Sequence, residues 1–309
     1  MEINIVKWVQ SLACGFLDSF LWIITKMGEE TFFLLVLLGI YLLYDKRFAF
    51  KYSMIYLSSV GVNFVAKNII KRPRPHIASN EIVNKLPASG YSFPSGHSQG
   101  FAVQASTIYW QVNKSTDKRS VKIPLLISLI VVGILVMFSR LYFGQHYLTD
   151  VLVGVFCGIM VFILIELFLK ALPKKFKEKF TTDRLYLFLL IVSALVFGVF
   201  FILEMTKGIV KAKVYKLTAV FIAISVGYFL DKKYIHYNEK SSMNKSLLKG
   251  LVLYVILAIF LVCINVWWKV NGIWLFLLYL SISLICTIIL PLIFTKVFRE
   301  TYNENIRNK

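Results

Sequence analysis

A histidine and an aspartate four positions apart, His146 and Asp150, have the residue types and the spacing for nucleophilic catalysis. If the segment that leads into the next apolar run is helical, both side chains lie on one face of the helix. The carboxylate can then hold one imidazole nitrogen while the other attacks an electrophile. Arg140, at the end of the preceding apolar run, is suited to binding an oxyanion such as phosphate. Taken alone, a pair with this spacing is more often an ordinary hydrogen bond on a helix surface.

A second cluster, Pro94-Ser95-Gly96-His97, precedes another apolar segment and has the composition of a helix start. The free backbone N–H groups at such a start bind anions, Gly96 lets an anion approach the backbone closely, and Ser95 adds a hydroxyl. His97 is then placed to donate a proton to a leaving oxygen. The alternative is a capped helix with a histidine at the membrane interface.

Two cations, Lys67 and Arg74, make a third cluster. If the apolar segment before them stays helical to about Ile70, Lys67 faces the following loop, while Pro73 and Pro75 end the helix and hold Arg74 extended. The alternative is a basic cap on the end of a membrane span. No set of three or four His, Asp, Glu or Cys residues accompanies the clusters, so the sequence predicts no metal site.

Apolar segments must position these clusters. Hydrophobic residues make up 58% of the sequence and aromatic residues 16%, which is above the apolar share of an ordinary soluble domain. Uncharged apolar runs of the roughly 20 residues needed to cross a bilayer recur along the whole chain. The sequence predicts an all-α integral membrane protein with ten candidate spans, at about residues 8–27, 31–44, 50–66, 98–112, 123–138, 151–169, 185–203, 217–230, 250–268 and 273–294.

The formal net charge of +19 would suggest a nucleic-acid partner in a soluble protein. Here the lysines and arginines concentrate in short loops between apolar runs, where they set membrane topology and meet anionic lipids. No recognisable nucleic-acid module is present, so none is expected as a partner. The distribution of cations predicts that both termini are cytoplasmic and that the three clusters share the outer face of the membrane.

Together and in this order, the three clusters closely resemble the three-part signature of the type 2 phosphatidic acid phosphatase superfamily, over about residues 8–169. This family includes membrane lipid phosphatases, bacterial undecaprenyl-pyrophosphate phosphatases and soluble vanadium haloperoxidases. The resemblance implies a six-helix catalytic core at 1–170. About four further transmembrane helices at 185–295 would form a C-terminal region of unassigned role, followed by a cytoplasmic tail at 296–309.

Carried over position by position, the resemblance implies that His146 attacks phosphorus to form a phosphohistidine and that Asp150 orients it. His97 would protonate the leaving group, and water would then cleave the intermediate. Fixed cations and donors would hold the phosphoryl oxygens in place of a metal, so no cofactor is expected. Those phosphate-binding residues are Lys67, Arg74, Ser95, Gly96 and Arg140.

The implied activity is hydrolysis of a lipid phosphate or pyrophosphate at the outer face of the plasma membrane. The resemblance ranks an undecaprenyl or other isoprenyl pyrophosphate first, with phosphatidylglycerol phosphate and phosphatidic acid next. The expected partners are the lipid substrate and membrane lipids, and the sequence does not predict an oligomeric state. Two alternatives stay open: a phosphotransferase with the same intermediate, and a lipid transporter or flippase, since many spans with intramembrane carboxylates also fit that class.

Overall fold

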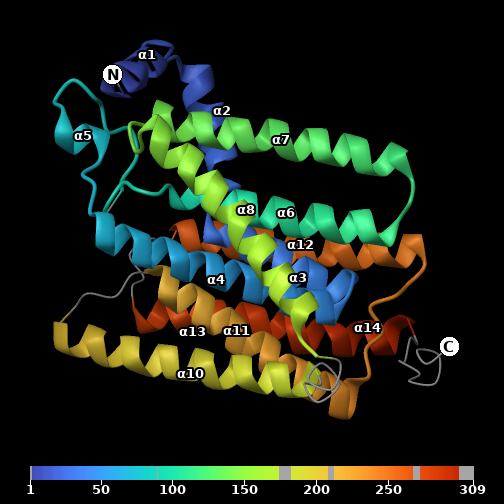
Figure 1. Cartoon of the computed structure of the whole chain (residues 1–309). Helices are drawn as coiled ribbons and strands as arrows, with labels where there is room; N and C mark the ends of the chain where they lie inside the picture. The colour runs from blue at the N-terminus through green and yellow to red at the C-terminus, as the bar shows by residue number, and fades with distance from the viewer. Residues whose placement is uncertain (1, 89, 174–181, 208–211, 267–271, 299–309) are drawn as a thin grey trace. The chain divides into compact units, whose positions relative to one another are not determined.

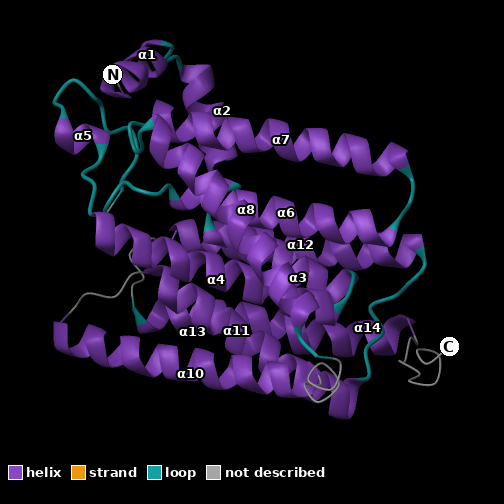
Figure 2. Cartoon of the chain, in the orientation of Figure 1, coloured by secondary structure: helices purple, strands orange, loops and turns teal. Residues whose placement is uncertain are grey.

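The computed structural model describes residues 2–88, 90–173, 182–207, 212–266 and 272–298 (Figure 1). These residues form helices and loops, with no strand among them (Figure 2). The prediction of an all-α protein is therefore confirmed. The predicted tail at 296–309 lies outside the described residues from position 299 onward.

Apolar helices of membrane-spanning length confirm an integral membrane protein. By length and composition, the described part of the chain holds five candidate spans and two shorter apolar helices. The five are α7 (Arg119–Tyr142), α8 (Leu148–Ala171), α11 (Ala212–Leu230) continuing into η1 (Asp231–Ile235), α12 (Met243–Val266), and α13 (Ile273–Leu284) continuing through η2 (Ile285–Ile289) and α14 (Leu290–Phe298). The shorter apolar stretches are α3 (Glu30–Leu43) and the segment Tyr186–Val199 of α10 (Thr182–Lys207).

The first predicted span, at 8–27, is wrong as a continuous helix. It is divided into α1 (Glu2–Ser11) and α2 (Gly15–Lys26), with extended backbone at Cys14. The reason is polar anchoring of α1: Gln10 Nε2 donates to the carbonyl oxygens of Val83 at 2.7 Å and Tyr142 at 3.1 Å. These bonds hold α1 against a loop and a helix end.

Contacts between Cα atoms divide the chain into two compact units. The first comprises Met1–Phe33 and Tyr52–Leu172, and the second comprises Leu34–Lys51 and Pro173–Lys309. The boundaries therefore fall within α3 and within α4 (Lys46–Ile70). All predicted site residues belong to the first unit. The division into a catalytic core at 1–170 and a C-terminal region of unassigned role at 185–295 stays a prediction.

The second unit has an apolar core and a buried ion pair of its own. Its core cluster includes the fully buried Leu42 and Leu253. At one end of this core, the Lys46 ammonium donates to Asp231 and to the carbonyl oxygen of Tyr237. The pairing keeps both buried charges satisfied, which burial in an apolar setting requires.

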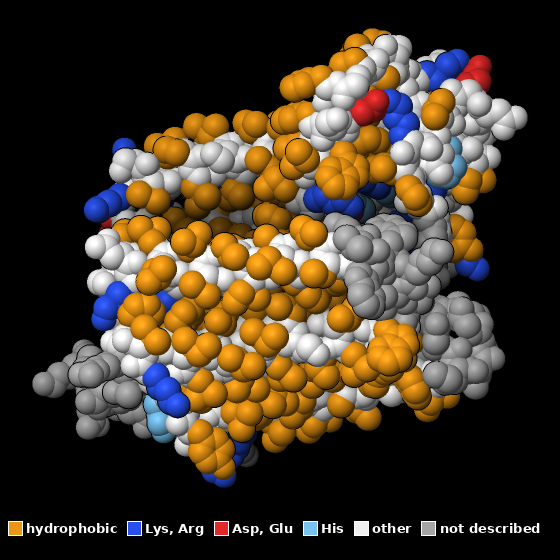
Figure 3. Space-filling model, turned by 180° about the vertical axis from the view of Figure 1, so that it is seen from behind, with side chains coloured by type: hydrophobic (Ala, Val, Ile, Leu, Met, Phe, Trp, Pro, Cys, Tyr) orange, Lys and Arg blue, Asp and Glu red, His pale blue; other side chains and the backbone are white. Residues whose placement is uncertain are grey.

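Large apolar side chains also cover the outside of the candidate spans. Phe156 and Phe168 on α8 are 62% and 64% exposed, and Leu195 on α10 is 64% exposed. Broad areas of the visible surface consist of hydrophobic side chains (Figure 3). Apolar surface of this extent needs a lipid environment in place of water.

Within the first unit, α6 (Gly96–Ser115) lies beside both α7 and α8 (Figure 1). Gly154 and Gly158 allow α8 to approach α6 closely. A Cβ atom on Gly154 would lie 2.7 Å from the Ser95 carbonyl oxygen, and one on Gly158 would lie 2.6 Å from the Gln99 carbonyl oxygen. Small residues at four-residue spacing are a common way for membrane helices to pack. The close packing brings the start of α6 next to the start of α8.

Candidate active site

The three predicted clusters converge where α4, α6, α7 and α8 end or begin. The backbone N–H of Ser95 donates to the carbonyl oxygen of Asp150 at 2.9 Å. Arg74 Nη1 donates to the carbonyl oxygen of Gln145 at 3.0 Å. Lys67, in the last turn of α4, donates to that of Ser92 at 3.0 Å. These contacts join segments that lie far apart in the sequence.

His146 and Asp150 face each other, although the helical reasoning behind their pairing is wrong. Nδ1 of His146 lies 3.5 Å from Oδ2 of Asp150, and the two residues are 2% and 0% exposed. His146 lies outside the helix, since α8 begins at Leu148 after the extended Tyr147. Asp150 turns back toward the helix start and accepts the backbone N–H of Tyr147 at 2.9 Å. A carboxylate in the first turn commonly caps free N–H groups in this way, and the capping directs it toward His146.

Two further donors fix the Asp150 carboxylate. Arg72 Nη1 donates to Oδ1 at 2.8 Å. The Ser92 hydroxyl donates to Oδ2, and its oxygen lies 3.4 Å from Nδ1 of His146. With the Tyr147 N–H, the buried charge is surrounded by hydrogen bonds, which buried carboxylates require. The carboxylate is therefore held in one orientation beside the imidazole.

Arg74 and Lys67 bring positive charge to the other side of His146. Arg74 Nη1 lies 3.4 Å from Nε2 of the imidazole, and Arg74 Nε donates to the Gly90 carbonyl oxygen at 3.0 Å. Burial lowers the pKa of the Arg74 guanidinium, and the charge of Asp150 partly opposes this shift. Lys67 Nζ donates to the carbonyl oxygens of Tyr91 and Ser92. Both cations thus stabilise the loop before α6 while facing the histidine.

Arg140 is buried at the end of α7 and is 5% exposed. Its Nη1 donates to the Thr25 hydroxyl at 2.7 Å. Among the described residues, no acceptor lies within hydrogen-bond reach of its buried Nε. A buried donor without an acceptor costs about 1–3 kcal/mol, so this position favours an added anionic oxygen.

His97 lies in the first turn of α6 and faces Glu29, with Nε2 3.8 Å from Oε1. Burial and the charge of Arg140 lower the pKa of His97 to about 4, against the opposing charge of Glu29. Burial alone raises the pKa of Glu29, but its interactions with His97 and Lys26 bring it down to about 2. His97 is therefore neutral near pH 7.

The start of α6 has the predicted form. Ser95 is the N-cap residue, and its hydroxyl oxygen accepts the backbone N–H of Ser98 at 3.4 Å. Gly96 is the first helical residue, and a Cβ atom there would lie 3.4 Å from Oδ1 of Asn63. The helix start therefore presents its backbone N–H groups in the geometry that binds anions.

His146 is held neutral by its surroundings. Burial lowers its pKa well below the ordinary value, and the charges of Arg140, Arg74 and Lys67 lower it further. A neutral imidazole can act as a nucleophile, while a protonated one cannot. The arrangement combines a neutral histidine, an orienting carboxylate and nearby cations, which together suit transfer of an anionic group.

Comparisons with known proteins identify the family. Residues 48–174 match the model described as the PAP2 superfamily, and residues 215–301 match a second one, the PAP2 superfamily phosphatase transmembrane extension. The chain belongs to the PAP2 superfamily. The predicted resemblance is therefore confirmed, and the second match places a family-specific extension on the C-terminal helices.

Known members of the PAP2 superfamily match part of the chain. Dolichyldiphosphatase of Saccharomyces cerevisiae is 35% identical over 94 residues, which is 30% of this chain and 39% of that protein. Phosphatidylglycerophosphatase B of Bacillus subtilis is 32% identical over 136 residues, 42% of this chain and 64% of that protein. The chain thus spans less than two thirds of the length of the curated relatives it matches. The crystal structure of a transmembrane PAP2 type phosphatidylglycerolphosphate phosphatase from Bacillus subtilis aligns with a TM-score of 0.47 and 28% identity, covering 59% of this chain and 86% of that one.

Five residues that the sequence patterns do not single out also belong to this PAP2 site. Four of them contact predicted residues directly, namely Thr25, Glu29, Arg72 and Ser92. The fifth, Glu2, contacts Arg72. Arg72 carries a weak signal, because it lies two positions before Arg74 in the same basic stretch. The others give no local signal, since their partners lie more than fifty positions away along the chain.

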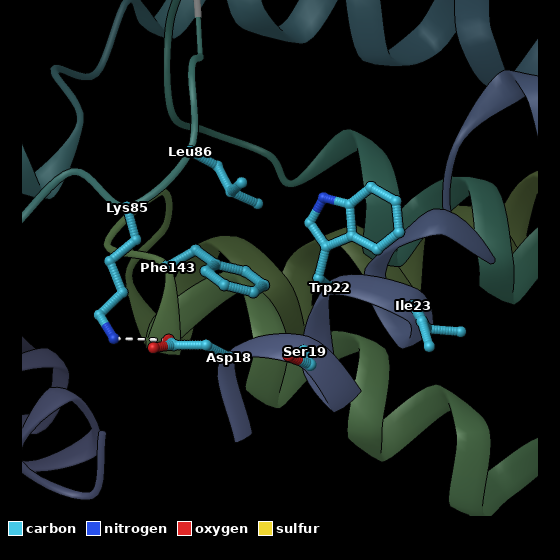
Figure 4. Close-up of a pocket in the computed structure, with 7 residues that line it drawn as sticks. All are labelled: Asp18, Ser19, Trp22, Ile23, Lys85, Leu86 and Phe143. Carbon is cyan, nitrogen blue, oxygen red and sulfur yellow. Dashed lines mark hydrogen bonds and ion pairs between the residues drawn. The ribbon is translucent and has the colours of Figure 1, made fainter. Parts of the chain in front are cut away.

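A pocket of about 650 Å³ opens between α2 and the loop near Lys85 (Figure 4). Its walls carry apolar side chains from Trp22, Leu86 and Phe143. At its edge, the Lys85 ammonium donates to Asp18 at 2.7 Å.

In the part of the chain that the structure describes, no three His, Cys, Asp or Glu side chains gather to form a metal site.

Proposed function

We propose that this chain is a lipid phosphatase that hydrolyses a lipid phosphate or pyrophosphate through a phosphohistidine on His146. The observation that supports this best is the neutral, buried His146 with Asp150 at 3.5 Å from Nδ1 and Arg74 at 3.4 Å from Nε2. In this reaction Nε2 forms a bond to phosphorus, the P–O bond to the leaving group breaks, and His97 protonates that oxygen. Water then cleaves the N–P bond and releases inorganic phosphate.

The cations would stabilise the charge that develops on the phosphoryl oxygens. Arg74, Arg140 and Lys67 all act electrostatically on His146, the position that phosphorus would approach. A phosphoryl oxygen near Arg140 would also satisfy its buried Nε. The first N–H groups of α6, after Ser95, add neutral donors. Fixed charge of this kind supplies most of the stabilisation in phosphoryl transfer.

Within this class we favour an isoprenyl pyrophosphate as the substrate, followed by phosphatidylglycerol phosphate and phosphatidic acid. The curated relatives include a dolichyldiphosphatase and a phosphatidylglycerophosphatase, so both head-group types occur among similar proteins. Purified protein in detergent should release phosphate from at least one lipid in a panel of these three. Release without any acceptor supports hydrolysis, whereas transfer of the phosphoryl group to an added lipid acceptor, with no inorganic phosphate released, would make the chain a phosphotransferase. A folded protein that moves labelled lipid across vesicles and releases no phosphate would be a transporter.

The role of His97 predicts proton uptake when an anion binds. With a pKa of about 4, His97 is neutral in the free protein above that pH. A bound phosphate would bring negative charge beside it, raise its pKa and so protonate it. Calorimetric titration with inorganic phosphate near pH 6, in buffers of different ionisation enthalpy, should show uptake of up to about one proton more in the wild type than in His97→Gln. Equal proton uptake in the two proteins would remove His97 as the acid.

The proposed orientation places the site on the extracytoplasmic side, with both termini in the cytoplasm. Asn80 lies exposed in the loop between α4 and α6, and Ser242 lies exposed in a predicted cytoplasmic loop. In a variant with the four native cysteines replaced, an impermeant maleimide should label Asn80→Cys in intact cells. Ser242→Cys should react only after permeabilisation. The reverse pattern would invert the topology.

A further inference from the structure

We propose that Glu2 and Arg72 form a positioning relay that holds the Asp150 carboxylate against His146, so that helix α1 sets the turnover rate. The inference rests on the proposed function of His146. Neither Glu2 nor Arg72 is among the predicted catalytic or phosphate-binding residues. Both belong to one continuous hydrogen-bond network. The network runs from α1 through the α4–α6 loop to the first turn of α8.

Arg72 is bound by protein groups on the Asp150 side of the site. Its Nη1 donates to Asp150 Oδ1 at 2.8 Å and to the Thr149 hydroxyl at 2.7 Å. Its guanidinium carbon lies 3.8 Å from the centre of the Tyr147 ring, a stacking geometry that arginine favours. The hydrogen bonds and the contact with the Tyr147 ring together hold the guanidinium group in one orientation. Arg72 can orient a carboxylate in this geometry, whereas Arg74 faces the attacking nitrogen.

Glu2 completes the relay from the far side of Arg72. Arg72 Nη2 donates to Glu2 Oε2, and Glu2 Oε1 accepts the Thr149 hydroxyl at 2.7 Å and the Thr149 backbone N–H at 3.1 Å. Burial alone raises the pKa of Glu2, but hydrogen bonds from Thr149 and the charge of Arg72 lower it overall. Glu2 is therefore ionised at neutral pH. It holds both Arg72 and the N-terminal turn of α8.

Contacts independent of Arg72 keep α1 in place. Val6 and Val9 on α1 are 0% and 2% exposed, and Val9 packs in a cluster with Leu141 and Val151. The Gln10 side chain accepts the Val83 backbone N–H at 3.1 Å in addition to the two bonds that it donates. The helix is thus a fixed support, and Glu2 presents its carboxylate to Arg72 from a rigid position. Removing the relay should loosen Asp150 without releasing α1.

The test is steady-state hydrolysis of isoprenyl pyrophosphate and phosphatidic acid by the full chain in detergent. Arg72→Gln should lower kcat by about 10–100-fold, because an orienting partner is lost. KM and competitive inhibition by inorganic phosphate should change by less than about twofold, since Arg72 does not reach the phosphoryl group. Arg72→Lys keeps the charge and loses the planar fork, so its kcat should lie between those of the wild type and Arg72→Gln.

A double-mutant cycle separates the relay from a general loss of stability. Glu2→Gln should lower kcat by about 3–10-fold. The double variant should be no slower than Arg72→Gln alone, because the glutamine oxygen can still accept the Thr149 bonds and the interaction that is lost is the one with Arg72. Lys7→Gln is the matched control, since it removes an exposed ion pair with Glu81 from the same helix. Its kcat should stay within about twofold of the wild type.

Unchanged kcat in both Arg72→Gln and Glu2→Gln would overturn the relay, as would losses that multiply in the double variant. A large rise in KM with unchanged kcat would overturn it too and make Arg72 a phosphate ligand. If Arg72→Gln does not purify in folded form, Arg72→Lys and Glu2→Gln decide the question by the same criteria. These outcomes require an active wild type, whereas failure of the proposed function would appear as a wild type that releases no phosphate.

Discussion

Replacing His146 by asparagine should lower phosphate release by at least about 10⁴-fold, because no other side chain in the described site can take over as nucleophile. Of the other described histidines near the predicted cations, His97 faces Glu29 at 3.8 Å and not Asp150, and Nδ1 of His76 contacts the Gly144 carbonyl oxygen at 3.1 Å. The substitution keeps a polar side chain in the buried position and removes the attacking nitrogen. Phosphate release from isoprenyl pyrophosphate by purified protein measures the effect.

His236→Asn is the matched control for this experiment. His236 is exposed, lies in the second unit, and has a left-handed backbone conformation (φ 53°) that asparagine tolerates. It should keep wild-type activity. Acid-labile labelling from ³²P-labelled substrate should appear in this control and be absent in His146→Asn. Wild-type turnover by a folded His146→Asn protein would end the phosphohistidine mechanism.

The residue types at the site were predictable from the sequence because the chemistry restricts them. A nucleophilic histidine needs a carboxylate, and an anionic substrate needs cations and helix starts, so the three clusters stand out in an apolar chain. The helical explanation for the His146–Asp150 spacing is wrong, since His146 precedes α8. The pair forms through helix capping, which holds Asp150 back toward Tyr147. Spacing alone does not separate these two geometries.

Contacts between distant segments explain what the sequence could not provide. Glu2 and Thr149 are 147 positions apart, and Thr25 and Arg140 are 115 positions apart. Such partners are defined by packing, including the approach of α8 to α6 at Gly154 and Gly158. The break between α1 and α2 is of the same kind, because the side-chain bonds of Gln10 reach Val83 and Tyr142. A hydropathy pattern shows only how long and how apolar a segment is, so it predicts one span where the structure has the two helices α1 and α2.

Replacing Asp150 by asparagine should lower kcat by about 10³–10⁴-fold while leaving the protein folded. The carboxylate accepts donors from Arg72, Ser92 and the Tyr147 N–H and lies 3.5 Å from His146. An amide of the same shape can present an N–H group to the imidazole, which favours the wrong tautomer of His146. Because Oδ2 also accepts the Tyr147 N–H, an amide turned this way gives up that bond, and the opposite orientation places its N–H group against Arg72.

Asp231→Asn is the matched control for the loss of a buried charge. Asp231 also accepts a backbone N–H, from Tyr237 at 2.9 Å, and also pairs with a buried cation, Lys46. It lies in the second unit and has no proposed chemistry. Both variants should lose thermal stability to a similar degree. Only Asp150→Asn should lose far more kcat than its loss of stability explains. Equal losses of activity in the two variants would assign Asp150 a structural role.

The pH dependence of kcat shows whether Asp150 orients the His146 imidazole or controls its protonation. The pKa of His146 is already well below its ordinary value, through burial and the charges of Arg140, Arg74 and Lys67. Removing a negative charge can only lower it further, so His146 is neutral in both proteins from about pH 6 to about pH 8. The ratio of wild-type to Asp150→Asn kcat should therefore stay constant over this range. A ratio that rises with pH over this range would mean that Asp150 raises the pKa of His146 and acts by setting its protonation, and the purely orienting role would be lost.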